Sequence, residues 1–241
     1  MRKIVVAVIL LLSSVALVGA ENGLVVISSI HSTIKKGAII KSTQTIELQS
    51  GESLKLLSST GGIIQVQGPY SGAIAFESKA SDGSVLKSVS ELVKNSKSTD
   101  FTLAIFRNSS VTTPTYRPDI WGIDIRRSGK YCLRPNLPIH LWWPQASPGQ
   151  MITLTDTTNS QSIEIKWPDR KNYTTWPEIL SVNDRVIYSV KDTEESFFSE
   201  FKIQLLPTDL KNDMEQIAWL SDHDCKKQAI RLLGTIVNEN R

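Results

Sequence analysis

The stretch Trp121–Trp143, "WGIDIRRSGKYCLRPNLPIHLWW", decides the fold, because the rest of the chain is organised around it. It holds three of the six tryptophans, the tight-turn signal Ser128-Gly129-Lys130, and Cys132, one of the two cysteines. The other cysteine, Cys225, lies far away in a C-terminal segment with helical spacing. A bond between the two cysteines would fasten the tail of the chain to its middle.

From Ile120 to Leu206, apolar residues alternate with polar ones, which is the pattern of half-buried strands. The apolar positions fall into these groups: Trp121, Ile123 and Ile125; Tyr131–Leu133; Ile139, Leu141 and Trp143; Met151–Leu154; Ile163, Ile165 and Trp167; Val186, Tyr188 and Val190; Phe201, Ile203 and Leu205. About seven short strands in a stretch of this length are typical of a β-sandwich. We expect an immunoglobulin-like topology, although the spacing alone does not fix the strand order.

The N-terminus has the three parts of a secretory signal peptide. Arg2 and Lys3 are basic, residues 4–17 are apolar, and Val18-Gly19-Ala20 is a small-residue cleavage signal. We expect residues 1–20 to be removed, which leaves a periplasmic or secreted chain that begins at Glu21. The alternative is an uncleaved anchor, because the apolar run is near the lower limit of about 17 residues for a span. No other stretch is long and apolar enough, so no membrane span is expected in the mature chain.

The mature chain has a nearly balanced charge. Removing residues 1–20 takes away two of the 27 basic residues and none of the 24 acidic ones, so the net charge falls to about +1. A surface with this balance offers no electrostatic footprint for nucleic acid or for an acidic membrane surface. We therefore expect neither as a partner.

The tail reads as a pair of helices over residues 208–238. Thr208 is the expected cap of the first helix and Asp222 that of the second. Apolar residues of the second helix recur at Cys225, Ala229, Leu232, Leu233 and Ile236. This spacing places Cys225 on the buried face. Two cysteines in an exported protein favour one disulfide, so we predict a Cys132–Cys225 bond, with two buried free thiols as the alternative.

Residues 21–115 read as a separate N-terminal β-rich domain. Apolar residues alternate at Ile46 and Leu48, Leu54 and Leu56, and Ile64 and Val66, with glycine turns at Ser50-Gly51 and Gly61-Gly62. These patterns predict a small antiparallel meander that ends at Gly68-Pro69.

A change of period at residues 82–97 predicts one helix, capped by Asp82, with Leu86, Val89, Leu92 and Val93 on its buried side. Phe101–Phe106 is one more expected strand. The polar stretch "RNSSVTTPTYRPD" that follows is the best linker, so we place a domain boundary near residue 115 and assign residues 116–241 to the sandwich and helix pair.

No arrangement of residues predicts catalysis or a cofactor. The three histidines, His31, His140 and His223, are scattered, whereas a zinc site needs three or four ligands together. Cys225 lies on an apolar stripe in an oxidising compartment, which is the wrong setting for a nucleophilic thiolate. Nucleotide-binding, metalloprotease and serine-hydrolase motifs are also missing from the sequence. We therefore predict a protein that is not an enzyme and that has no cofactor or metal.

Three tryptophans, Trp143, Trp167 and Trp176, each precede a proline. At strand ends they form a candidate aromatic binding surface for a sugar or a peptide. The alternative is that these large rings plug the end of the sandwich while proline stops each strand.

Residues 34–72, "IKKGAIIKSTQTIELQSGESLKLLSSTGGIIQVQGPYSG", resemble the β-repeat of FecR-like periplasmic domains. Both have a glycine-led entry, a strand, the pattern G-x-x-L-x-L, a glycine turn and another strand. The whole layout also resembles exported bacterial proteins with an "SGKYC…LWWP…WP" middle and a C-terminal cysteine helix. FecR-like proteins relay signals through a membrane span, and the resemblance supplies no catalytic residue.

Together these features predict a mainly β (α+β) exported protein. A small antiparallel N-terminal β region with one helix precedes an immunoglobulin-like β-sandwich closed by two C-terminal helices. The expected function is a non-enzymatic module that binds a protein partner or an envelope polymer, as an accessory to envelope signalling or assembly. The alternative is an envelope carbohydrate-active hydrolase, which a cleft lined with close carboxylates would favour.

Overall fold

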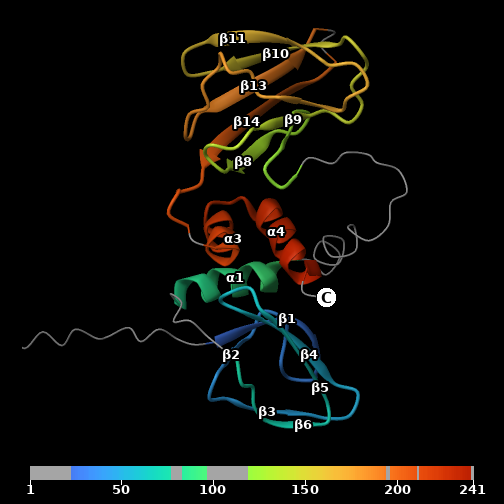
Figure 1. Cartoon of the computed structure of the whole chain (residues 1–241), viewed down its shortest axis with the longest axis vertical. Helices are drawn as coiled ribbons and strands as arrows, with labels where there is room; N and C mark the ends of the chain where they lie inside the picture. The colour runs from blue at the N-terminus through green and yellow to red at the C-terminus, as the bar shows by residue number, and fades with distance from the viewer. Residues whose placement is uncertain (1–22, 77–82, 97–118, 194–195, 211, 240–241) are drawn as a thin grey trace, which may run out of the picture.

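A computed structural model describes residues 23–76, 83–96, 119–193, 196–210 and 212–239. They form three parts along the long axis of the molecule: an N-terminal β region, a layer of helices and a β-sandwich (Figure 1). The predicted signal peptide, the Asp82 cap, the Phe101–Phe106 strand and the boundary near residue 115 lie outside the described residues. None of the helices in the described part of the chain has the length and apolar character of a membrane span.

The N-terminal region consists of two antiparallel sheets. Its strands are β1 (Gly23–Ile30), β2 (Ile39–Lys41), β3 (Thr45–Leu48), β4 (Ser53–Ser58), β5 (Ile63–Gln67) and β6 (Tyr70–Ala73). The larger sheet has the order β2-β1-β4-β5, while β3 pairs with β6. The predicted simple meander is therefore wrong, because β3 leaves the larger sheet. Its side chains Ile46 and Leu48 are buried against Leu54 and Leu56 on one face of that sheet.

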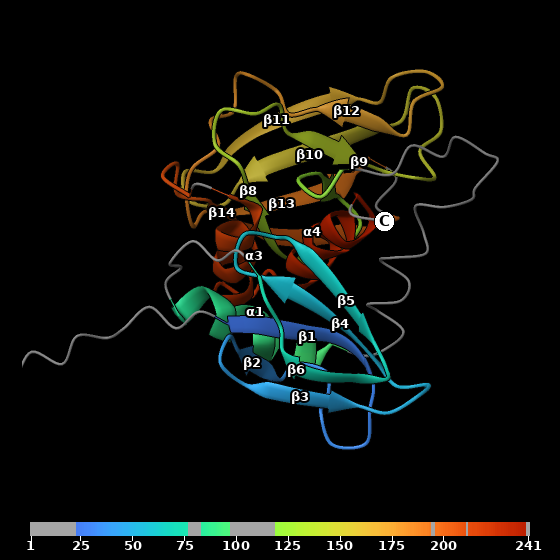
Figure 2. The ribbon, with the colours of Figure 1, turned by 60° about the horizontal axis from the view of Figure 1, so that its bottom comes forward.

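Helix α1 (Gly83–Asn95) covers the opposite face of the larger sheet (Figure 2). The four predicted positions, Leu86, Val89, Leu92 and Val93, are all buried. The backbone of Gly37, at φ +84°, lies so close to the helix that a Cβ at this position would be 2.6 Å from the Cβ of Lys94. A side chain at residue 37 would therefore push the helix off the sheet.

The predicted sandwich is present. Its strands are β7 (Ile123–Asp124), β8 (Gly129–Leu133), β9 (His140–Trp142), β10 (Met151–Asp156), β11 (Gln161–Lys166), β12 (Tyr173–Thr175), β13 (Ile187–Asp192) and β14 (Phe198–Leu205). A five-stranded sheet, β11-β10-β13-β14-β8, faces a three-stranded one, β12-β9-β7, across a shared core. Strand β12 was not predicted. The pairs β8–β14 and β7–β9 are parallel, which distinguishes this strand order from the antiparallel constant-type immunoglobulin arrangement.

Two C-terminal helices follow the sandwich, as predicted, but their starts differ from the prediction. Helix α3 (Asp213–Asp222) is capped by Asn212, whose side chain accepts the N–H of Glu215, so the Thr208 cap is wrong. Helix α4 is Lys226–Glu239. Asp222 ends α3 instead of capping α4, and its carboxylate accepts the hydroxyl of Ser88 from α1.

The helices share one core with both β regions. Val25, Ile27 and Leu57 of the larger N-terminal sheet, α1, α3, α4, and Cys132 and Leu206 of the sandwich belong to this core. The helix pair thus closes one end of the sandwich, and it also packs against α1. This packing ties the two predicted domains together.

The predicted link between Cys132 and Cys225 is present, with the two sulfur atoms 2.02 Å apart and both residues buried. Beside it, the buried side chain of Gln228 accepts the N–H of Cys132 at 2.9 Å. The same amide donates to the carbonyls of Cys132 at 2.7 Å and Ile120 at 2.8 Å. A helix side chain therefore pairs with the outer edge of β8, where no further strand is present among the described residues.

Candidate functional site

The tryptophans of the candidate aromatic surface are core residues. Trp143, Trp167 and Trp176 are 3%, 1% and 9% exposed. The rings of Trp143 and Trp167 meet edge to face at 5.4 Å, and the indole N–H of Trp167 donates to the carbonyl of Lys171. This is the alternative in which the rings fill the sandwich, so the three residues do not form a binding surface.

The histidines have local structural roles in three separate places. His31 Nδ1 accepts the N–H groups of Thr33 and Ile34, which organises a turn. The ring of His223 stacks on Trp219 at 3.9 Å, and that of His140 meets another ring edge to face. In the described part of the chain, no group of three or more His, Cys, Asp or Glu side chains is placed to hold a metal ion.

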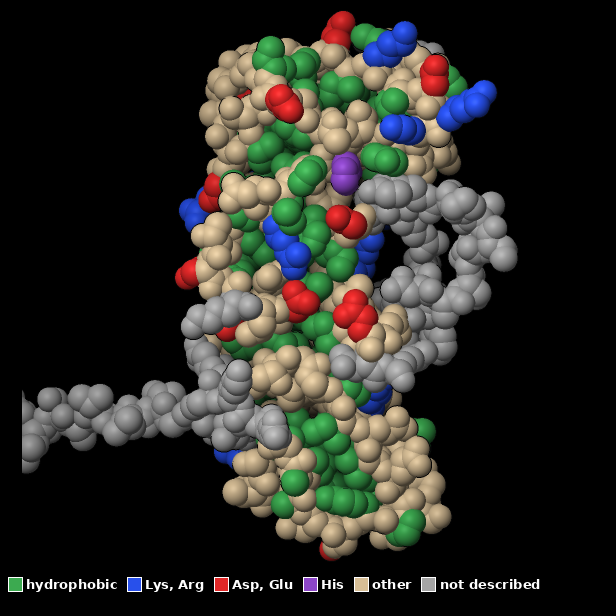
Figure 3. Space-filling view, in the orientation of Figure 1, with side chains coloured by type: hydrophobic (Ala, Val, Ile, Leu, Met, Phe, Trp, Pro, Cys, Tyr) green, Lys and Arg blue, Asp and Glu red, His purple; other side chains and the backbone are tan. Residues whose placement is uncertain are grey.

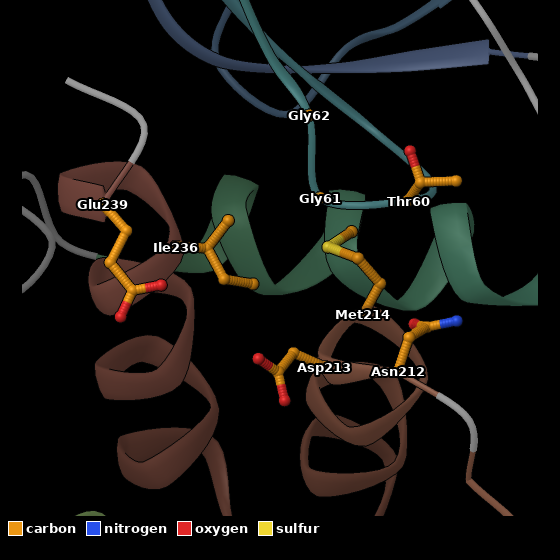
Figure 4. A pocket seen from close by; sticks show the side chains of 8 residues that line it. All are labelled: Thr60, Gly61, Gly62, Asn212, Asp213, Met214, Ile236 and Glu239. Atoms are coloured by element: carbon orange, nitrogen blue, oxygen red, sulfur yellow. The ribbon is translucent and has the colours of Figure 1, made fainter.

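A groove lies where the turn between β4 and β5 meets the helices (Figure 4). It has a volume of about 600 Å³, and its lining residues are Thr60, Gly61, Gly62, Asn212, Asp213, Met214, Ile236 and Glu239. The backbone of Gly61 sits close to both helices, since a Cβ there would lie 3.7 Å from Ile236 Cγ2 and 3.9 Å from Met214 Cγ. The tip of the hairpin thus forms one wall, and the start of α3 and the end of α4 form the other.

A second hollow of about 280 Å³ adjoins the groove along β5. It shares Thr60 and Gly62 with the groove. Its other lining residues are Ser58, Ile63, Ile64, Ala75 and Phe76. The two hollows therefore meet at the tip of the hairpin, and the second has a mixed lining of apolar and uncharged polar residues.

Strand β5 forms the border of its sheet (Figure 2). Hydrogen bonds from Ser58 N–H to Gly62 O and from Gly68 N–H to Glu52 O fix the pairing with β4. Because inward and outward groups alternate along an antiparallel strand, the backbone groups of Ile63, Gln65 and Gln67 point away from β4. No hydrogen bond from these outward groups to another described segment is present.

The other long edges of the described sheets are protected. Strand β11 has Glu164 and Lys166 on its outer edge, and charges there discourage pairing with another chain. The outer edge of β8 is occupied by Gln228. In contrast, β5 has no charged residue.

The surface of the N-terminal β region, which carries β5, is also poor in charge. On the face seen in Figure 3, few charged side chains lie over the N-terminal β region, while most of them lie over the helices and the sandwich. The scarcity of charge is visible in the sequence, because no charged residue occurs between Lys55 and Glu77. The alternation of Ile64 and Val66 predicts a strand there, but only the sheet order shows that this strand is an edge.

Comparison of the chain with protein-family models, with curated proteins and with solved structures gave no match.

Proposed function

We propose that this chain is an exported, non-enzymatic binding module that takes up an extended segment of a protein partner as an additional strand beside β5. The observation that carries the proposal is the edge of β5. Ile63, Gln65 and Gln67 present three successive outward N–H and C=O pairs, and the first of them borders a hollow that has no charged lining residue. Strand addition uses such main-chain groups for affinity and adjacent hollows for side-chain specificity.

Two further features support a partner in the bacterial envelope. The signal-like N-terminus and the buried cysteine pair both suit an oxidising, extracytoplasmic compartment. The resemblance to FecR-like periplasmic domains covers residues 34–72, which include β5. Recognition of a polymer by an aromatic surface has less support, because the three candidate tryptophans are buried.

The groove does contain two carboxylates, which is the feature that would favour a hydrolase. Asp213 is ion-paired with Arg134 at 3.2 Å, and Asp213 and Glu239 are both exposed. A carboxyl group that acts as general acid needs surroundings that keep it protonated, usually a desolvated pocket. We therefore assign these carboxylates to recognition.

The test uses a random peptide library displayed on phage and selected on the purified, disulfide-intact chain. Binding of the selected peptides is then measured to two proline variants. In Gln65→Pro the missing N–H points away from β4, and proline is tolerated at such edge positions. Glu164→Pro is the matched control, because the N–H of Glu164 likewise points away from β10.

We expect apolar and polar residues to alternate in the selected peptides. Their affinity for Gln65→Pro should be lower than for the original chain by about tenfold or more, whereas their affinity for Glu164→Pro should be unchanged. Equal binding to both variants would refute strand addition at β5. Failure to select any peptide, with a concentration-dependent dimer broken by Gln65→Pro, would show that a second copy of the chain occupies the edge instead.

A further inference from the structure

The groove at the end of β5 differs in charge from the hollow beside it. The 280 Å³ hollow has no charged lining residue, whereas the 600 Å³ groove contains the carboxylates of Asp213 and Glu239. Figure 4 shows both carboxylates pointing into the space between α3 and α4. A strand added to β5 would therefore meet the uncharged hollow beside Ile63 and Ile64, and beyond it an acidic pocket at one end.

The walls of this pocket suit a long side chain. Met214 and Ile236 line it with apolar atoms, and Gly61 brings only backbone to the rim. The carboxyl end of α4 adds negative potential, since the last carbonyls of a helix carry partial negative charge. No basic residue is among those that line the groove. Arg134 approaches Asp213 from outside this set, and its guanidinium also donates to Gln216 at 2.6 Å.

We propose that the partner segment carries a lysine or arginine, which enters this pocket while its neighbours pair with β5. This inference rests on the proposed strand addition and deepens it by giving the partner a sequence character. A lysine would lay its aliphatic stem along Met214 and Ile236 and place its ammonium group between the two carboxylates. Because β5 leads into the groove at Gly62, the basic residue lies toward one end of the bound segment, and apolar residues face Ile63 and Phe76.

The experiment scans one selected peptide with lysine and, at each position, compares lysine with methionine, which is similar in length but uncharged. At one position near an end of the peptide, we expect the lysine peptide to bind about threefold to tenfold more tightly than the methionine peptide. Two partly exposed ion pairs provide a gain of this size. The double variant Asp213→Asn/Glu239→Gln should remove this preference, so that the lysine and methionine peptides bind to it with equal affinity. Asp169→Asn/Glu178→Gln, which removes the same charge from exposed positions on the sandwich, should keep the preference.

A preference for lysine that survives in Asp213→Asn/Glu239→Gln, or the lack of a lysine preference at any position, would overturn the acidic pocket. Gln65→Pro separates the two proposals. If neither the lysine nor the methionine peptide binds to Gln65→Pro, strand addition at β5 is supported. If in addition the original chain shows no preference for lysine, only the proposal of a basic residue in the pocket is refuted.

Discussion

The link between Cys132 and Cys225 should contribute a large share of the stability of this chain. The two residues are 93 positions apart, and for a closed loop of that length the chain-entropy estimate is about 4.6 kcal/mol. Loss of a native disulfide typically costs about 2–5 kcal/mol, which for a chain of this size corresponds to a fall in Tm of roughly 5–15 °C. We expect this range for the Cys132→Ala/Cys225→Ala variant.

The structure also predicts where the molecule should loosen. The bond connects β8 of the sandwich to the start of α4, while α3 and α4 remain packed on α1 in the shared core. The helices should therefore stay with the N-terminal region, and the contact between helices and sandwich should weaken. The packing of α3 on α1, which joins residues distant in sequence, is the reason to expect this result.

The assay combines thermal unfolding with limited proteolysis, on the variant and on the reduced original chain. Both should melt lower and be cleaved first in the exposed segment at residues 207–209, between β14 and α3. A Tm within about 1 °C of the oxidised chain would refute the stability argument. Two titratable thiols in the native protein would refute the bond itself.

Three further predictions concern residues outside the groove. Gln228→Leu leaves the N–H and the carbonyl of Cys132 without their partner. It should therefore lower the free energy of unfolding, measured by urea titration, by about 2–4 kcal/mol. A change below about 0.5 kcal/mol would contradict the role assigned to Gln228. Trp167→Ala should cost about 3–5 kcal/mol in the same assay, with unchanged peptide binding whenever the variant is folded. Burial opposes ionisation of Asp192, but hydrogen bonds from Ser196 and Phe197 outweigh it and lower the pKa of its carboxyl. Its stabilising effect is therefore present above the ordinary Asp pKa of about 3.9 and is lost as the pH falls through the lowered value. When the free energy of unfolding is measured at a series of pH values, its fall at low pH should be smaller in Asp192→Asn than in the original chain. An equal fall in both would contradict the role assigned to Asp192.

The spacing of apolar residues correctly predicted those elements in which that spacing alone identifies the buried face. The stripe of α1 and most sandwich strands are of this kind, and so is the inward position of Cys225. The start of α3 was missed because Thr208 and Asn212 are both good caps, each followed by an aspartate. Glu215, three residues after Asn212, is the local signal that favours the second cap: its N–H donates to the Asn212 side chain, and its carboxylate accepts the amide of that side chain.

The candidate site depends on contacts between residues distant in sequence, which periodicity does not reveal. The pairing of β3 with β6 leaves β5 at the sheet border, and the acidic pocket forms only when the ends of α3 and α4 meet the turn at Gly61. The Trp-Pro pairs were equally ambiguous, because a large ring at a strand end can face solvent or core. The edge contact of Trp143 with Trp167 shows that the core position applies.

The most direct test of strand addition is amide hydrogen exchange, measured residue by residue by NMR, with and without a selected peptide. The outward N–H groups of Ile63, Gln65 and Gln67 should become protected when the peptide binds. The N–H groups of Ile64 and Val66 face β4 and should change little. Unchanged exchange at residues 63, 65 and 67 in the bound state, or new protection along β11 instead, would contradict the account.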